Sequence, residues 1–190
     1  MQGRSISPST ALCGLTNIIA GALILAFLKG YQVPLFLSYF THKIWHIVGA
    51  ILLIGHAFTG AVWFIIAWLK EDQKLLKFSV ECYRLLDLLC TLPGVLLLTV
   101  NGLAMASVYK DEVSNRWILQ SLWLVLGASF FSFLLLLPIQ ERLFHLAESG
   151  PPNAPALKRM WIAWSITGTA IFLPFGAVFY LMVTKQPFTF

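Results

Sequence analysis

Charged residues are scarce in this chain of 190 residues: lysine, arginine, aspartate and glutamate make up 11% of it, against 58% hydrophobic residues. A soluble domain has about a quarter charged residues, so an ordinary soluble domain is excluded. The net charge of +5 comes from lysines and arginines that stand singly between apolar runs. Because there is no basic cluster, nucleic acid is not expected as a partner. The expected partner is the lipid bilayer.

Metal-binding patterns are also lacking. The three cysteines lie in or beside apolar runs, where a thiol packs as a small hydrophobic group, and none has ligand spacing. His42 and His46 have the i, i+4 spacing that places two imidazoles on one helical face. In their half of the membrane, however, the only carboxylates are Asp111 and Glu112, in a loop. The sequence therefore predicts no metal site.

Long apolar runs, by contrast, are abundant. A bilayer crossing needs about 20 helical residues, and five runs qualify: 11–28, 36–69, 80–108, 117–138 and 160–183. Their connections, KGYQVP, KEDQKLLKFS, YKDEVSN and QERLFHLAESGPPNAPALKR, are too short for a soluble domain. The first run lacks a convincing cleavage site and is interpreted as a retained helix. Residues 1–190 are thus predicted to form one all-α membrane domain, with a four-helix core and a peripheral N-terminal helix.

The distribution of lysine and arginine predicts the orientation. With five crossings, eight of these residues fall on the N-terminal side and five on the other. The eight are Arg4, Lys70, Lys74, Lys77, Arg84, Arg142, Lys158 and Arg159. The positive-inside rule then predicts a multi-pass protein of the cell (inner) membrane with a cytoplasmic N-terminus and an external C-terminus.

Three histidines lie in the second run, on one repeat of alternating spacings of four and three residues. The members of this seam are His42, His46, Gly49, Leu53, His56, Gly60 and Trp63. Such a repeat faces neighbouring helices in a left-handed bundle, so we expect the histidines to face protein. His56 lies about 15 Å deeper than His46 by helix rise.

The same alternation recurs in the next two runs. It joins Arg84, Asp87, Thr91, Gly94, Leu98, Asn101 and Met105 in the third run, and Arg116, Gln120, Trp123, Gly127, Phe130 and Leu134 in the fourth. Both seams are expected to face inward, because lipid requires an apolar exterior. Arg84 and Asp87 are predicted to pair at i, i+3 on the inner side. Kinks are expected at Pro93, Pro138 and Pro174.

Antiparallel crossings place His42, His46, Asn101, Met105 and Gln120 at one depth on the outer side. A b-type heme with two histidine ligands needs imidazoles from two helices at matching depth, and no second histidine is predicted opposite His46. Met105 is a candidate second ligand, and two copies of His46 or His56 could meet in a homodimer. Glycines on the seam would leave room for a flat macrocycle, or would only let helices pack closely.

Four motifs occur in order: His46-Ile47-Val48-Gly49, RLLDLLCTLPGVLLLTVNGL, LPIQERL and LMVTKQP. From about Phe40 to Gln186 they resemble an uncharacterised family of bacterial predicted integral membrane proteins, known only as a domain of unknown function. The family is distantly similar in layout to HemJ-type membrane protoporphyrinogen oxidases and to copper-resistance D-like four-helix proteins. The resemblance implies a membrane helix bundle and leaves the first helix outside it.

The HemJ resemblance implies a heme-ligating histidine at the position of His46. The HemJ type also has an essential lysine in a Trp-Leu-x-x-Lys-Leu context, where this chain has Ser121 in the run that begins at Trp117. Oxidase chemistry is therefore not implied, and whether the chain is an enzyme stays open.

Two hypotheses about function follow. In the first, heme b or a porphyrin binds in the outer half of the core, with His46 as ligand, Met105, Asn101 and Gln120 lining the site, and His42 and His56 as further candidates. In the alternative, the chain is a non-catalytic subunit or assembly factor of a larger membrane complex, and its polar seams only fix helix register. A transporter is disfavoured because five helices lack inverted-repeat symmetry.

Overall fold

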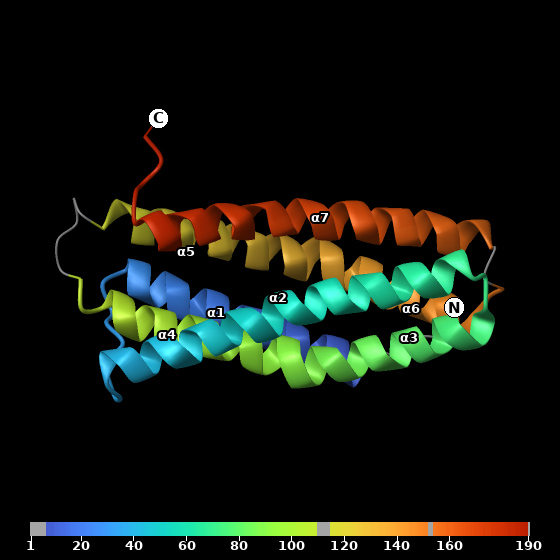
Figure 1. The fold of residues 1–190 in the computed structure, drawn as a ribbon, viewed down its shortest axis with the longest axis horizontal. Helices are drawn as coiled ribbons and strands as arrows, with labels where there is room; N and C mark the ends of the chain where they lie inside the picture. Colours follow the sequence, from blue (N-terminus) through green and yellow to red (C-terminus); the bar gives the residue numbers. More distant parts are fainter. Residues whose placement is uncertain (1–6, 110–114, 152–153, 190) are drawn as a thin grey trace.

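The computed structural model describes residues 7–109, 115–151 and 154–189, and throughout these ranges the regular structure is helical. The elements are α1 (Pro8–Leu28), α2 (Tyr39–Leu69), α3 (Gln73–Leu86), η1 (Asp87–Thr91), α4 (Leu92–Ala106), α5 (Arg116–Phe131), η2 (Ser132–Leu136), α6 (Leu137–Ser149) and α7 (Pro155–Thr184). Two continuous rods, α3-η1-α4 and α5-η2-α6, each contain a π-helical segment. Figure 1 shows five antiparallel rods, all long and apolar enough to span a membrane. The all-α membrane fold is confirmed.

Arg4, Asp111 and Glu112, named above, lie outside the described residues. The third and fourth rods are longer than the apolar runs, because Gln73–Ala106 and Arg116–Ser149 are each continuous. Most of KEDQKLLKFS and the first ten residues of the last connection are therefore helical. These parts are amphipathic, so their helices form by burying one apolar face and exposing the charged one.

Local sequence signals account for the helix starts. Ser7, Ser38 and Asp72 are N-caps whose side chains accept backbone N–H groups of the first turn. Pro8 follows Ser7 as the first residue of α1, a position where a missing N–H group costs nothing. Asp72 caps α3 after a turn of only three residues, so α2 and α3 form a tight helical hairpin.

The four later rods converge at one end of the bundle, which we call the Arg84 end. Its apolar core takes residues from α2, α3, α6 and α7: Phe64, Ala67, Leu76, Val80, Tyr83, Leu143, Phe144, Ala147, Leu157 and Trp164. Trp68 and Trp161 stack beside it with ring centroids 5.3 Å apart. The predicted four-helix core is thus built most compactly at this end.

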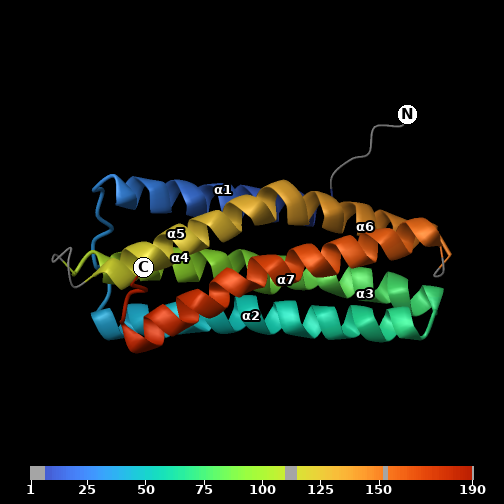
Figure 2. The ribbon, with the colours of Figure 1, turned by 90° about the horizontal axis from the view of Figure 1, so that it is seen from above.

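At the opposite end, which we call the His42 end, the rods separate into two pairs. α2 packs along α4 (Figure 2) and α5 packs along α7, whereas α2 and α7 diverge toward this end (Figure 1). The closest approach of α2 and α4 is at Gly49 and Gly94, where a Cβ atom added to Gly49 would lie 2.7 Å from the Leu98 backbone nitrogen. Only glycine permits this spacing of the two backbones.

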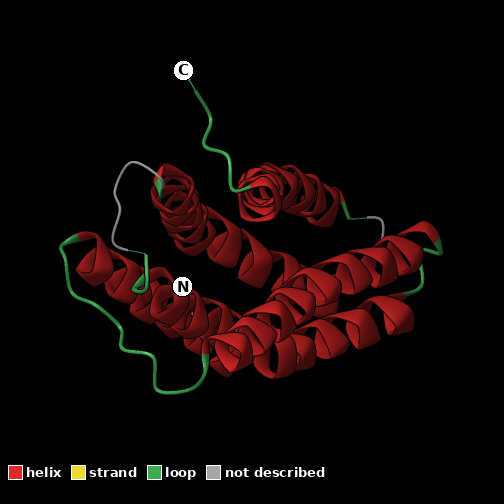
Figure 3. Cartoon of the chain, turned by 60° about the vertical axis from the view of Figure 1, so that its left-hand side comes forward, coloured by secondary structure: helices red, strands yellow, loops and turns green. Residues whose placement is uncertain are grey.

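α1 supplies no residue to the apolar core of the Arg84 end, but it is well packed and not peripheral: 28% of its most apolar stretch is buried, against 6% in Arg116–Ser149 and 11% in Pro155–Thr184. It contacts α4, η1 and α5 and buries Cys13, Ala20 and Ile24 against them. Figure 3 shows that the two helix pairs splay apart. α1 therefore links the pairs where α2 and α7 no longer meet.

Both π-helical segments stand directly before a Leu-Pro step. η1 precedes Leu92-Pro93 and η2 precedes Leu137-Pro138. Proline lacks an N–H group and its ring clashes with the carbonyl four residues back, and a wider turn relieves both conflicts. In each case the preceding leucine donates to the carbonyl five residues earlier, Asp87 or Ser132. Pro174 lies inside α7 without such a segment.

Candidate functional site

His42 lies at the start of α2 and is fully buried. The Leu37 N–H group donates to its Nε2 at 3.2 Å, so the ring proton belongs to Nδ1, which donates to Asn101 Oδ1 at 2.7 Å. Asn101 is 5% exposed, which confirms that this side chain faces the core. Because both ring nitrogens of His42 already have partners, neither is free for a ligand.

His46 lies one turn later and is half-buried between α2 and α4. Its Nδ1 donates to the Leu98 carbonyl at 2.8 Å. The ring packs on Gly102, where an added Cβ would come within 2.9 Å of Cε1. No described residue forms a hydrogen bond with Nε2. A backbone carbonyl on one ring nitrogen fixes the tautomer and leaves the other as a lone-pair donor, as in histidines that bind metal.

The two remaining outer candidates have different surroundings. Met105 is half-buried on α4, one turn after Asn101. Gln120 on α5 forms two hydrogen bonds of 2.9 Å with the backbone of Phe188, one in each direction, and so fastens the C-terminal tail. The structure thus joins His42 to Asn101, places His46 on the same α2–α4 interface, and places Gln120 in a separate contact.

The predicted inward seam of the fourth run is wrong. Trp123 and Phe130 are 59% and 57% exposed. The buried residues of α5 are instead Trp117, Ile118, Ser121 and Ala128. The physical reason is that α5 packs against α1 and α7 rather than against α2 and α4, so another face is covered.

A second group of polar side chains lies deeper, around His56 and Asp87. His56 Nε2 donates to Asp87 Oδ1 at 3.0 Å, and Thr91 donates to the same oxygen at 3.1 Å. Asp87 Oδ2 accepts from Gln140 Nε2 at 2.9 Å, and Gln140 Oε1 accepts from Trp164 Nε1 at 3.3 Å. Residues from α2, η1, α6 and α7 therefore share one buried network.

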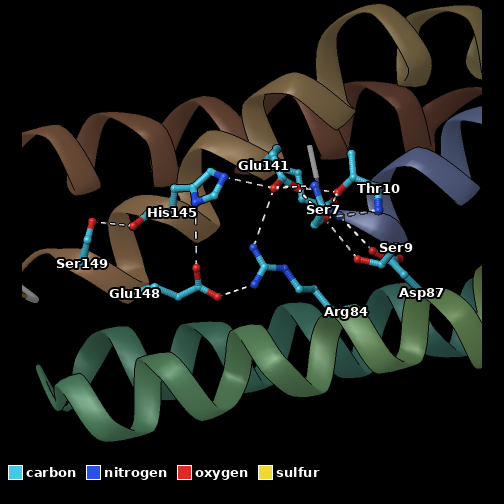
Figure 4. Close-up of polar contacts among 10 residues, drawn as sticks. Ser7, Ser9, Thr10, Arg84, Asp87, Glu141, His145, Glu148 and Ser149 are labelled. Atoms are coloured by element: carbon cyan, nitrogen blue, oxygen red, sulfur yellow. Dashed lines mark hydrogen bonds and ion pairs between the residues drawn. The ribbon is translucent and has the colours of Figure 1, made fainter. Parts of the chain in front are cut away.

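A third group forms the charged cluster of the Arg84 end (Figure 4). The Arg84 guanidinium pairs with Glu148 and lies 3.7 Å from Glu141, and His145 Nε2 lies 3.2 Å from Glu141. Glu141 Oε2 accepts from Ser7 Oγ at 2.9 Å and from Thr10 Oγ1 at 2.5 Å. These hydroxyls fasten the start of α1 to α6.

The predicted pair of Arg84 with Asp87 is therefore wrong. Arg84 bonds carboxylates of α6, and Asp87 bonds His56 and Gln140. The reason is that α3 packs on α6, which supplies two carboxylates to Arg84, whereas Asp87 begins the π-helical segment and faces α2.

The family model for predicted integral membrane proteins (DUF2269) matches residues 40–186, more than half of the chain. The chain belongs to this family. The DUF2269 match includes every histidine, Asn101, Arg84 and Asp87. α1 precedes it, so Ser7 and Thr10 lie outside the match. No curated protein and no solved structure matches the chain.

In the described part of this DUF2269 chain, no three His, Cys, Asp or Glu side chains lie close enough together to bind a metal ion. At the His42 end, His46 Nε2 is the candidate donor, because His42 has both ring nitrogens bonded; His56 also has a nitrogen, Nδ1, that no described residue bonds, but it belongs to the separate network of Asp87. The arrangement therefore suits a group that needs one axial imidazole from the chain rather than a bare ion.

Proposed function

We propose that this DUF2269 protein binds heme b or a related porphyrin at the His42 end, with His46 as axial ligand. The observation that carries the proposal is the state of the His46 ring. Its Nδ1–H group bonds the Leu98 carbonyl, and Nε2 has no partner among the described residues. This fits an imidazole ligand, whose orientation is normally fixed by such a second hydrogen bond.

The direction of His46 supports the same site. Phe64 follows five turns later, at about 3.6 residues a turn, and so lies on the same face of α2. Phe64 contacts Trp164 of α7, with ring centroids 5.8 Å apart. His46 thus starts from the face of α2 that meets α7 at Phe64, and its ring lies against α4, on the Leu98 carbonyl and Gly102.

The residues of the chain have distinct roles in this proposal. His46 donates the nitrogen ligand, Leu98 fixes its tautomer, and Gly102 leaves space for the ring. Met105, half-buried one turn after Asn101, is the candidate second ligand, because histidine with methionine is an established axial pair. Heme b, when bound, supplies one-electron redox chemistry or binds a diatomic ligand at the iron.

We also propose that the Arg84 end faces the cytoplasm. Seven of the eight cationic residues counted on that side lie within the described residues, all but Arg4. The His42 end and the proposed site would then face the outside of the cell membrane.

The test is the absorption spectrum of the full chain, purified in detergent after expression with ample heme. We expect a Soret band that His46→Ala removes or strongly shifts, because loss of an axial ligand changes the field at the iron. Added imidazole should restore the band in His46→Ala by replacing the missing side chain. His145→Gln, at the Arg84 end, is the matched control and should keep it.

Two results would refute the proposal. A colourless wild-type protein that also fails to take up added hemin has no such site. If His46→Ala keeps an unchanged band while the protein is folded, the ligand is another residue.

A second candidate function is that of a non-catalytic subunit or assembly factor. It is favoured by the exposure of the last two rods. Only 6% of the most apolar stretch of Arg116–Ser149, and 11% of that of Pro155–Thr184, is buried within the chain. These faces leave wide surfaces for neighbouring helices, of a second copy or of another membrane protein. Native electrophoresis of solubilised membranes tests this, since a free subunit would migrate as one chain in its detergent micelle.

A further inference from the structure

The pair formed by His56 and Asp87 lies inside the span and is shielded from its surroundings. The two side chains are 3% and 8% exposed. Ionisable groups inside a membrane are costly and mark ion or proton sites more often than other positions do. The pair takes no part in the heme proposal and stands apart from it.

The Asp87 carboxylate is surrounded by hydrogen-bond donors. His56 Nε2, Thr91 Oγ1 and Gln140 Nε2 all point donors at its two oxygens. Because Nε2 carries the proton of this contact, a neutral His56 ring would keep its lone pair on Nδ1. That atom is buried and has no hydrogen-bond partner among the described residues. A buried polar atom without a partner needs an explanation, and a titrating role is one of the few available.

The neighbouring ring of Tyr83 shields one side of His56. Its centroid is 4.8 Å from that of His56, and the rings meet edge to face. Tyr83 can approach α2 because residue 60 is glycine, where an added Cβ would lie 2.5 Å from the tyrosine ring.

The buried and half-buried charges of this end favour proton uptake, since its other lysines, arginines and carboxylates are exposed to the surroundings. Arg84 supplies one positive charge, whereas Asp87, Glu141 and Glu148 supply three negative charges. With both His56 and His145 neutral, these groups carry a net charge of −2, and protonation of both imidazoles brings it to zero. The other titratable groups beside Asp87, Tyr83 and Cys13, are neutral in their ordinary forms. Compensation matters because an unpaired charge is costly at low dielectric.

We infer that His56 and Asp87 form an intramembrane proton-binding site that fills from the Arg84 end. A hydronium ion from water gives up one proton, an Nδ1–H bond forms on His56, and Asp87 balances the new charge. The pair changes from −1 to neutral, and no other reactant is needed.

Access from the Arg84 end follows from the polar groups that continue toward it. His145 and Glu148 are 39% and 33% exposed and contact Glu141 or Arg84. Glu141 is the chain neighbour of Gln140, which bonds Asp87. Toward the His42 end, the α2–α4 interface closes at the backbone contact between Gly49 and Gly94. Among the described residues, charged side chains therefore approach the pair from the Arg84 end.

Nitrogen NMR of histidine-labelled full-length protein in lipid vesicles tests the site. Substitution of each histidine by glutamine assigns the four rings, and His56 can be assigned by elimination if His56→Gln does not fold. We expect the His56 ring to go from one proton to two as the pH is lowered from about 8 to 5, whereas His42 keeps one. Asp87→Asn should keep the His56 ring at a single proton over this range, because the balancing charge is gone.

Hydrogen exchange of the His56 ring tests the side of entry. Glu141→Gln and His145→Gln should each slow it by about tenfold or more, as expected for loss of a proton-transfer group. Asn101→Leu, at the His42 end, should leave the rate unchanged. A wild-type His56 that keeps one ring proton from about pH 8 down to pH 5 overturns the inference and makes the pair a structural hydrogen bond. Slowing by Asn101→Leu alone would place the entry at the other end.

Discussion

Substitution of Gly49 by alanine should separate α2 from α4. The new Cβ would lie 2.7 Å from the Leu98 nitrogen and 2.8 Å from the Gly94 carbonyl oxygen. Both are backbone atoms and cannot rotate away, so the helices themselves must move apart. Overpacking of this kind costs about 1–3 kcal/mol. The same shift would stretch the two bonds that cross this interface, His42 to Asn101 and His46 to the Leu98 carbonyl.

Gly55 provides the matched control on the same helix. An added Cβ there meets nothing within 4 Å. Gly55→Ala should therefore stabilise the helix by about 0.5–1 kcal/mol, the usual gain of alanine over glycine. The free energy of unfolding can be measured for both variants by titration with SDS in mixed micelles, followed by far-UV circular dichroism. If Gly49→Ala is as stable as Gly55→Ala, the close approach of α2 and α4 is incorrect.

Two further predictions concern the core and the topology. Asn101→Leu should lower the free energy of unfolding by about 1–3 kcal/mol, because it leaves the buried Nδ1–H group of His42 without an acceptor, and a smaller loss in the same SDS titration would show that His42 finds another partner. A reporter that works only in the cytoplasm should be active when fused after Gly150 and inactive at the C-terminus, and the reverse result would invert the proposed orientation.

The sequence was sufficient for the fold because hydropathy and length alone define bilayer-spanning helices. It also predicted most of the buried seams of α2 and α4, since Gly49, His56, Gly94 and Asn101 are all buried. Trp63, the last member of the α2 seam, is 42% exposed, so the prediction is wrong at that position. The sequence could not predict the inward face of α5, because periodicity shows which residues share a face but not which neighbour covers it. That choice depends on α1, whose insertion beside α4 and α5 is a tertiary feature.

The partner of His56 could have been found from the sequence. In a helical hairpin, residues equally far from the turn lie at the same depth. The turn at residues 70–72 lies midway between His56 and Asp87, and also midway between His42 and Asn101 and between Gly49 and Gly94. The i, i+3 spacing of Arg84 and Asp87 predicts a local ion pair instead, but the hairpin brings His56 to Asp87, and α6 supplies the carboxylates that bond Arg84.

α1 gives the molecule an unusual dependence on its own N-terminal segment. The family match begins at residue 40, after this helix, yet α1 contacts both α4 and α5 and buries Cys13, Ala20 and Ile24 there. A chain made only of the matched residues would expose that groove to lipid, together with the polar atoms of Glu141 that Ser7 and Thr10 now bond. The helix thus takes the place that a separate subunit would fill, and it brings its own polar anchor to the Arg84 end.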